Sequence, residues 1–128
     1  FSALRARGIK VVLNTGYDRS TAEKLIDKIG WSIGVNIDGL VTASDVSKGR
    51  PGPEMIQLAM KQTGVANAEA VVKIGDSQID IVEGENAECG LTFGITTGAQ
   101  TEAMLRVASP SYVVQSLSEF CRASGKSL

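Results

Sequence analysis

The sequence contains no histidine among its 128 residues. This absence excludes Ser-His-Asp and Cys-His nucleophile systems and every zinc site that needs an imidazole ligand. Any chemistry must therefore come from carboxylates, lysine, arginine, hydroxyl groups or a bound metal. Cysteine is also scarce. Cys89 and Cys121 stand 32 residues apart without metal-ligand spacing, so we expect reduced thiols in a cytosolic protein.

Long apolar runs and a strong excess of charge are also missing. No stretch approaches the length of about 20 apolar residues that crosses a bilayer, and the first residues lack the apolar centre of a signal peptide. The net charge of −1 gives no electrostatic reason to expect nucleic acid or a membrane surface as partner. A hydrophobic content of 43% is enough for a core. We therefore expect one cytoplasmic domain that binds neither nucleic acid nor membrane.

Strands and helices are predicted to alternate along the chain. Apolar runs predict strands at residues 9–13, 39–43, 71–74, 90–95 and 112–114. Periodic patterns predict helices at 20–29, 53–63, 77–87 and 101–107, and a terminal helix that opens at Ser116. Residues 31–38 are ambiguous and are interpreted as a connection. This alternation is typical of a doubly wound parallel α/β sheet.

Two kinds of local signal mark the helix ends. Ser20 and Glu23 have the spacing of a capping box, which predicts that Ser20 caps the helix over 20–29. Gly30 and Gly64 stand where a helix is expected to stop. Pro53 suits the first residue of the helix that ends before Gly64.

The rest of the chain is organised around the segment 71–80, in which two carboxylates come after a buried strand. Asp76 stands directly after the glycine that ends the strand, and Asp80 lies four residues later in the first helical turn. In open α/β sheets, ligands bind at this end of the strands. Two such carboxylates favour a hard divalent cation, Mg²⁺ above all. The structural alternative is that Asp76 caps the helix and Asp80 complements its dipole, and the local sequence leaves both open.

Polar loops come after three of the predicted strands, at residues 14–18, 44–50 and 76–80. We expect them to converge on one edge of the sheet, where they would supply a hydroxyl, one or two cations and the carboxylate pair. This combination indicates a phosphate site beside a metal site. Taken singly, Thr15 is better explained as a turn hydroxyl, and Arg50 and Lys48 as solvated surface charges.

The order of these segments resembles the core of the haloacid-dehalogenase-like hydrolase superfamily, and within it the phosphonatase-like branch. Residues 14–17 (Asn-Thr-Gly-Tyr) are similar to the second motif of that superfamily, a Ser or Thr that ends a strand. Residues 49–56 (Gly-Arg-Pro-Gly-Pro-Glu-Met-Ile) are similar to the third motif, and residues 75–80 (Gly-Asp-Ser-Gln-Ile-Asp) match the acidic fourth motif. The stretches 83–87 and 94–99 also resemble the segments beyond the fourth motif in the phosphonatase branch. Each motif is weak alone, but together their order covers nearly the whole chain.

The resemblance implies a Mg²⁺-dependent hydrolase that acts on a small phosphorylated or phosphonate substrate through an aspartyl-phosphate. Thr15 and the backbone N–H of Gly16 would hold the phosphoryl oxygens. Arg50 would neutralise phosphate charge and orient the nucleophile, with Lys48 as a weaker candidate for that role. Asp76 and Asp80 would hold Mg²⁺ directly or through water.

Some parts of the superfamily pattern are absent. No Asp-x-Asp occurs in the sequence, although this first motif supplies the nucleophile and the general acid/base. The cap domain that selects the substrate is also missing, together with the lysine that forms the imine in phosphonoacetaldehyde hydrolases. We therefore interpret residues 1–128 as the C-terminal part of a single core domain, inactive alone. The missing first strand belongs between the strands that end at Leu13 and Ile74, and an upstream segment, a second copy of the chain or a rearrangement should fill that place.

Two other functions are compatible with the sequence. One is a binding or regulatory module that keeps the fold without the chemistry, and an upstream Asp-x-Asp segment would distinguish the enzyme from it. The other is a phosphoryl-accepting receiver domain, which is also doubly wound. A receiver needs an early acidic pair and a phosphorylatable Asp at a strand end, and these do not occur in the right order here.

Overall fold

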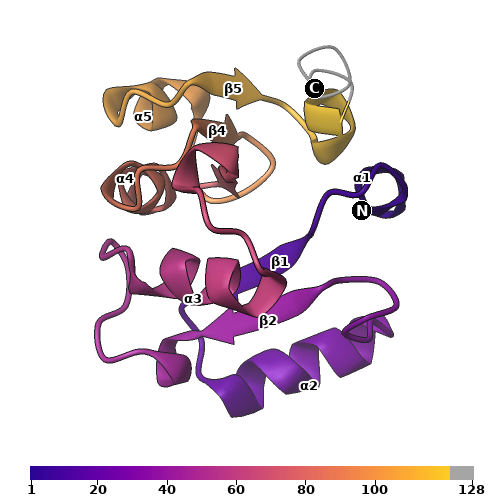
Figure 1. Ribbon diagram of the computed structural model, residues 1–128. Coiled ribbons are helices and arrows are strands. Elements are labelled where there is room, and N and C mark those ends of the chain that lie inside the picture. The colour runs from indigo at the N-terminus through magenta and orange to yellow at the C-terminus, as the bar shows by residue number, and fades with distance from the viewer. Residues whose placement is uncertain (122–128) are drawn as a thin grey trace. The chain divides into compact units, whose positions relative to one another are not determined.

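A computed structural model describes residues 1–121. They fall into two compact units, and the first ends in the sequence at Ala66. Figure 1 shows the helices and strands of both units. The first unit contains α1 (Ser2–Ala6), β1 (Val12–Thr15), α2 (Arg19–Ile29), β2 (Gly39–Thr42), the 3₁₀ turn η1 (Ala43–Asp45) and α3 (Glu54–Thr63). The second contains the 3₁₀ turn η2 (Ala68–Ala70), β3 (Val72–Gly75), α4 (Gln78–Asn86), β4 (Leu91–Ile95), α5 (Glu102–Val107) and β5 (Tyr112–Val114). Residues 117–121 are also helical, in agreement with the terminal helix predicted to open at Ser116.

Every strand pairing is parallel, which confirms the predicted fold class. In the first unit β1 pairs with β2, from Val12 opposite Gly39 to Thr15 opposite Thr42. In the second unit the strand order is β3-β4-β5. Within residues 1–121, β1 pairs only with β2, and β3 pairs only with β4. The gap between β1 and β3 in the sheet, and what fills it, stay predictions.

In the first unit, α2 and α3 lie on opposite sides of the β1–β2 pair (Figure 1). Strand β2 is buried along its whole length, as expected for a strand covered on both faces. Helix α3 packs on it and contributes Met55 and Ile56 to the core. Both helices end at a glycine in the left-handed conformation, Gly30 and Gly64, as predicted.

In the second unit, α4 and α5 pack against each other and against the sheet. Ile81 and Leu105 are fully buried, and both lie close to Gly94 of β4. The preceding residue on the same strand, Phe93, points to the opposite face because successive strand residues alternate. There its ring contacts Tyr112 and Phe120, with centroids 5.1 and 4.9 Å away. Both faces of this sheet are therefore occupied.

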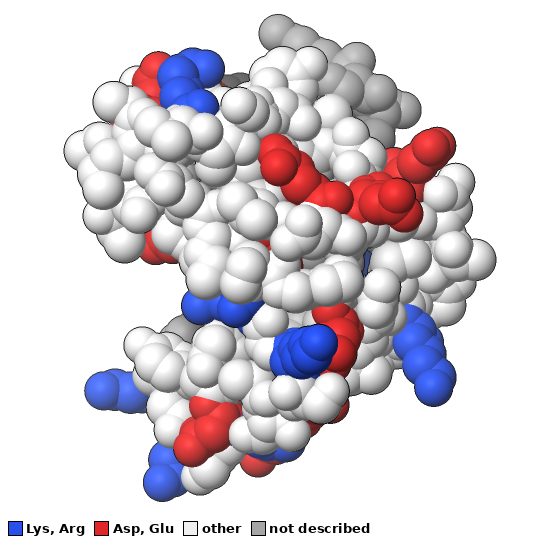
Figure 2. All heavy atoms as spheres, turned by 90° about the vertical axis from the view of Figure 1, so that its left-hand side faces the viewer, with Lys and Arg blue, Asp and Glu red and all other residues white. Residues whose placement is uncertain are grey.

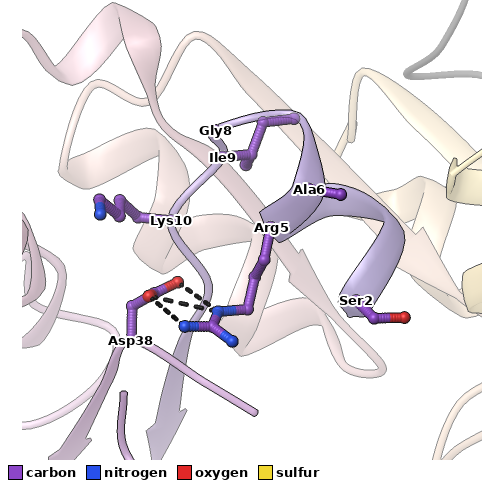
Figure 3. Close-up of a pocket in the computed structure, with 7 residues that line it drawn as sticks. All are labelled: Ser2, Arg5, Ala6, Gly8, Ile9, Lys10 and Asp38. Carbon is purple, nitrogen blue, oxygen red and sulfur yellow. Dashed lines mark hydrogen bonds and ion pairs between the residues drawn. The ribbon is translucent and has the colours of Figure 1, made fainter. Parts of the chain in front are cut away.

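The first strand begins later than predicted, at Val12 and not at residue 9. The reason lies in Val11, whose backbone N–H donates to the side chain of Asp38 at 2.8 Å. The same carboxylate accepts hydrogen bonds from Arg5 of α1 at 3.0 to 3.3 Å. Figure 3 shows this contact at a pocket of about 430 Å³ beside α1, and none of the predicted site residues lines that pocket.

The cap of α2 also differs from the prediction. The helix begins at Arg19, and its N-cap is Asp18, which accepts a hydrogen bond from the Thr21 N–H at 2.8 Å. The Thr21 side chain first, and then its backbone N–H, hold the pKa of the Asp18 carboxyl below its ordinary value. The predicted Ser20–Glu23 box is therefore wrong, because an aspartate two residues earlier satisfies the first turn. The start of α3 is closer to its prediction: the helix begins at Glu54, one residue after the predicted first residue, Pro53.

The cysteines, the lengths of the helices and the surface charges can each be compared with what the sequence led us to expect. Cys89 and Cys121 are both free, in agreement with the reduced thiols expected. Among residues 1–121 there is no helix with the length and apolar character needed to span a membrane. Lys, Arg, Asp and Glu side chains are scattered over the face drawn in Figure 2, where both signs of charge occur.

Candidate active site

The hydroxyl–glycine pair at residues 15 and 16 lies at the carboxyl end of β1. Thr15 is the last residue of the strand, although a loop was predicted from residue 14 onward. Its Oγ1 accepts a hydrogen bond from the Tyr17 N–H at 3.2 Å, so it serves as a turn hydroxyl. The carbonyl of Tyr17 in turn accepts from the Ala43 N–H at 3.1 Å. These bonds fix the turn after β1 against the end of β2.

Arg50 lies directly over this turn. A Cβ built on Gly16 would be 2.8 Å from Nη2 of Arg50, and the three nearest heavy atoms all belong to that guanidinium group. The arginine therefore covers the Gly16 backbone, although the two residues are 34 positions apart in the sequence. A side chain at position 16 would displace this guanidinium group. The structure thus places Arg50 beside the Thr15–Gly16 turn, and a role of these residues in phosphate binding stays a prediction.

Lys48 has a different environment. It is exposed, and its backbone N–H donates to Oε2 of Glu54 at 3.1 Å. The hydroxyl of Ser47 donates to the same oxygen at 3.1 Å. These bonds, the one from Lys48 first, lower the pKa of the Glu54 carboxyl. The loop is held by its backbone, and Lys48 supplies none of the atoms nearest Gly16. Arg50 is therefore the better candidate for contact with phosphate.

Asp76 comes directly after β3 and is partly exposed. Its Oδ2 accepts a hydrogen bond from the Ala99 N–H at 3.2 Å. The other oxygen, Oδ1, has no hydrogen-bond partner among residues 1–121. Asp76 is not the helix cap that the structural alternative required, because the N-cap of α4 is Ser77.

Asp80 is the acid of a capping box at the start of α4. Its Oδ2 accepts from the Ser77 N–H at 3.2 Å and from the Ser77 hydroxyl at 2.9 Å. Its side chain is 7% exposed, and its Oδ1 lies 3.9 Å from Nζ of Lys73. The structural role considered for Asp80 is therefore present, in the form of a capping box.

Lys73 and Glu83 are buried charged residues that were not predicted from the sequence. Nζ of Lys73, on β3, lies 3.2 Å from Oε1 of Glu83, on α4. Their side chains are 10% and 0% exposed. The signal that could have found them was a lysine inside an apolar strand, with an acid three residues beyond Asp80 on the same helix face. Lys73 therefore lies between two acids of α4.

The acids fit a magnesium site to different degrees. In the described part of the chain, no three Cys, Asp or Glu side chains are grouped as a metal site. Mg²⁺ is commonly held by one or two carboxylates, with water and substrate phosphate as the other ligands. Asp76 fits a direct ligand, because it is partly exposed and one oxygen is oriented by a backbone N–H. Asp80 is buried and engaged in its capping box, and fits a role through water better.

The fold and these residues define a class: parallel α/β domains with polar groups after their strands, here a hydroxyl and a guanidinium group in the first unit and carboxylates in the second. Comparison with known proteins narrows this class. Residues 1–88 match the model of the haloacid dehalogenase-like hydrolases. The chain belongs to this family.

Curated relatives agree with the assignment. The chain is 38% identical over 96 residues to a phosphonoacetaldehyde hydrolase of Parabacteroides distasonis, in an alignment that covers 75% of this chain and 36% of that protein. It is 28% identical to a phosphonoacetaldehyde hydrolase of Latilactobacillus sakei, in an alignment that covers 91% of this chain and 52% of that protein. The chain thus spans between about a third and a half of the curated relatives it matches.

Solved structures share the fold. A hydrolase from Pseudomonas syringae superposes with a TM-score of 0.85 at 22% identity, and the match covers 98% of this chain and 55% of that protein. A phosphonoacetaldehyde hydrolase-like protein from Oleispira antarctica gives a TM-score of 0.82 at 24% identity, with 98% and 53% covered. At these identities the likeness concerns the fold alone.

Proposed function

We propose that this chain is the C-terminal part of the core domain of a Mg²⁺-dependent hydrolase that acts on a small phosphorylated or phosphonate substrate. The observation that carries the proposal is the placement of Arg50 over Gly16 at the carboxyl end of β1. A guanidinium group beside a hydroxyl and a glycine turn suits the oxygens of a phosphoryl group. The relatives named phosphonoacetaldehyde hydrolase support a phosphonate among the substrates.

The first unit would bind the phosphoryl group. The Gly16 N–H and the Thr15 hydroxyl would donate to its oxygens, which requires the Thr15 hydroxyl proton to point away from the backbone. That is compatible with the observed bond, because Thr15 Oγ1 accepts there from Tyr17 and keeps its own proton free to donate. Arg50 would neutralise the remaining negative charge and orient the nucleophile.

The second unit would bind the metal. Asp76 would be the direct ligand through Oδ1, and Asp80 would act through water. When bound, Mg²⁺ supplies positive charge that offsets the charge of the phosphoryl oxygens. That these acids and the phosphate-binding residues share one site stays a prediction, as does the cytoplasmic location.

The nucleophile would come from an upstream segment of the same protein. The aspartate of an Asp-x-Asp motif would attack phosphorus, release the leaving group and form an aspartyl-phosphate that water then hydrolyses. The strand that carries this motif would lie between β1 and β3, and a cap domain would select the substrate. This chain alone should bind ligands without turnover.

The test is phosphate release by the full-length protein from phosphonoacetaldehyde and from p-nitrophenyl phosphate, with Mg²⁺ and with EDTA. We expect Mg²⁺-dependent turnover, and we expect Arg50→Met to lower kcat/KM by about 100-fold, as loss of one preorganised donor does. Lys61→Met is the matched control, since Lys61 is exposed on α3 and away from the strand ends. A full-length protein that binds Mg²⁺ and phosphate without turnover on any substrate would support the non-catalytic module and overturn the enzyme.

A further inference from the structure

We propose that the backbone of Gly98 and Ala99 positions the Asp76 carboxylate, so that Oδ2 is held and Oδ1 faces the metal ion. This inference rests on the proposed function, because it takes Asp76 as the metal ligand. Gly98 and Ala99 belong to the loop between β4 and α5, and both are exposed. They are positioning residues, since they act through Asp76 and touch no reacting atom.

Two contacts with Asp76 support the proposal. The Ala99 N–H donates to Oδ2 at 3.2 Å. The Gly98 backbone lies so close that a Cβ built there would overlap the same oxygen and Cβ of Asp76. Real Cβ atoms do not approach other atoms this closely. Position 98 therefore requires glycine as long as Asp76 keeps its present conformation.

The loop is also attached to the start of α4 at a second point. The Gln78 N–H donates to the side-chain carbonyl of Gln100 at 2.8 Å, and the Gln78 side chain donates to the carbonyl of Met104 at 2.7 Å. The loop thus cannot move away from Asp76 without breaking these bonds. A loop fixed in this way can define the direction of a carboxylate.

The consequence concerns metal affinity. Carboxylate ligands are commonly oriented by hydrogen bonds from outer groups, and loss of such a partner weakens metal binding by about 10- to 100-fold. With Oδ2 held by Ala99, the Asp76 side chain is restrained, so less conformational entropy is lost when Oδ1 binds the metal. A side chain at 98, or loss of the N–H at 99, would remove this orientation while the carboxylate of Asp76 stays available as a ligand.

The experiment is a calorimetric titration of Mg²⁺ into the full-length protein. We expect Gly98→Ala to raise the Kd for Mg²⁺ at least about 10-fold, and Ala99→Pro, which removes the N–H, to do the same. Ala99→Ser keeps the N–H at an exposed position and should leave the Kd within about twofold. An independent readout is the amide signal of residue 99 in ¹⁵N-resolved spectra, which should shift when Mg²⁺ is added to the wild type and to Ala99→Ser.

Gly90→Ala controls for general damage to the second unit. A Cβ at Gly90 would overlap the carbonyl oxygen of Glu69, a clash as severe as the one at Gly98 but against backbone elsewhere. We expect Gly90→Ala to lower Tm and to leave the Kd of the folded protein unchanged. Gly98→Ala, in contrast, should raise the Kd for Mg²⁺ in the folded protein and should lower Tm less than Gly90→Ala does.

The outcomes separate the two proposals. An unchanged Kd in Gly98→Ala and Ala99→Pro, with normal binding by the wild type, overturns the positioning role and leaves the proposed function standing. Equal losses of affinity in Gly98→Ala and Gly90→Ala also overturn it, because the effect is then structural. A wild type that binds no Mg²⁺ overturns the metal site itself, and with it both proposals.

Discussion

The two units contain the same local motif with different surroundings. In the first unit, Asp45 accepts from the N–H and hydroxyl of Thr42 at 2.8 and 3.0 Å. In the second, Asp80 accepts from the N–H and hydroxyl of Ser77 at 3.2 and 2.9 Å. Both are capping boxes at the end of a parallel strand. From the motif alone, the two aspartates cannot be told apart.

The cation beside each aspartate makes the difference. Arg19 binds Asp45 with two hydrogen bonds, Nε to Oδ1 at 3.0 Å and Nη2 to Oδ2 at 2.7 Å. This bidentate contact lowers the pKa of Asp45 to about 2. Lys73, in contrast, lies 3.9 Å from Asp80 and 3.2 Å from Glu83. Both oxygens of Asp45 thus accept hydrogen bonds from Arg19, and the role of Asp45 is structural. Asp80, in contrast, shares Lys73 with a second acid, Glu83.

Burial adds a second contrast. The side chains of Arg19 and Asp45 are 36% and 20% exposed, so solvent can replace either partner. Lys73 and Glu83 are 10% and 0% exposed, so neither can be rehydrated in place. A partly exposed ion pair contributes modestly to stability, whereas removing one partner of a buried pair leaves a charge in a poor environment. Substitutions in the two ion pairs should therefore differ in their effect on stability.

The largest effect is expected for Glu83→Gln. This change leaves Lys73 buried without its nearer acid and should lower the free energy of unfolding by about 3 kcal/mol or more. Urea denaturation followed by circular dichroism measures the loss. Glu85→Gln is the matched control, because Glu85 is exposed on the same helix and should change stability by less than about 0.5 kcal/mol. Equal effects of the two variants would show that burial does not matter here.

A double substitution sharpens the same point. Lys73→Met combined with Glu83→Leu replaces the buried pair by apolar side chains of similar size. We expect the double variant to be more stable than Glu83→Gln by about 2 kcal/mol, because no uncompensated charge is left between these two positions. The same denaturation experiment measures it. If the double variant is no more stable than Glu83→Gln, the main contribution of Lys73 to stability is its interaction with Asp80 and not with Glu83.

The smallest effect is expected for Asp45→Asn, although its capping motif is the same. Arg19 can be rehydrated, so the loss of stability at pH 7 should be about 1 kcal/mol. The pKa of Asp45 is lowered from 3.8 to about 2, so its contribution is present above pH 4 and disappears as the pH falls from about 4 to 2. An acid titration of wild type and variant should therefore converge near pH 2. Curves that run parallel down to pH 2 would contradict this role, and the Kd for Mg²⁺ should not change.

Much of the architecture could be predicted from the sequence, since each part depends on local pattern. The strand at Tyr112–Val114 and the stops at Gly30 and Gly64 arise from β-branched runs and from the left-handed turn that glycine favours. The cap of α2 was mispredicted because a neighbouring residue, Asp18, competes with Ser20, whereas the start of β1 was mispredicted because a distant side chain competes with the local signal. Asp38 takes the N–H of Val11 and so delays β1, although 27 residues separate them.

Local pattern was enough to establish the fold class, the order of the motifs and the identity of the candidate residues, because periodicity and turn chemistry are properties of short segments. Folding was needed to show that Arg50, and not Lys48, covers Gly16, that Lys73 is buried beside Glu83, and that the loop at 98–99 holds Asp76. These facts depend on which atoms meet after the chain has folded. Contacts between residues more than 20 positions apart, such as Asp76 and Ala99, leave no periodic trace in a single sequence.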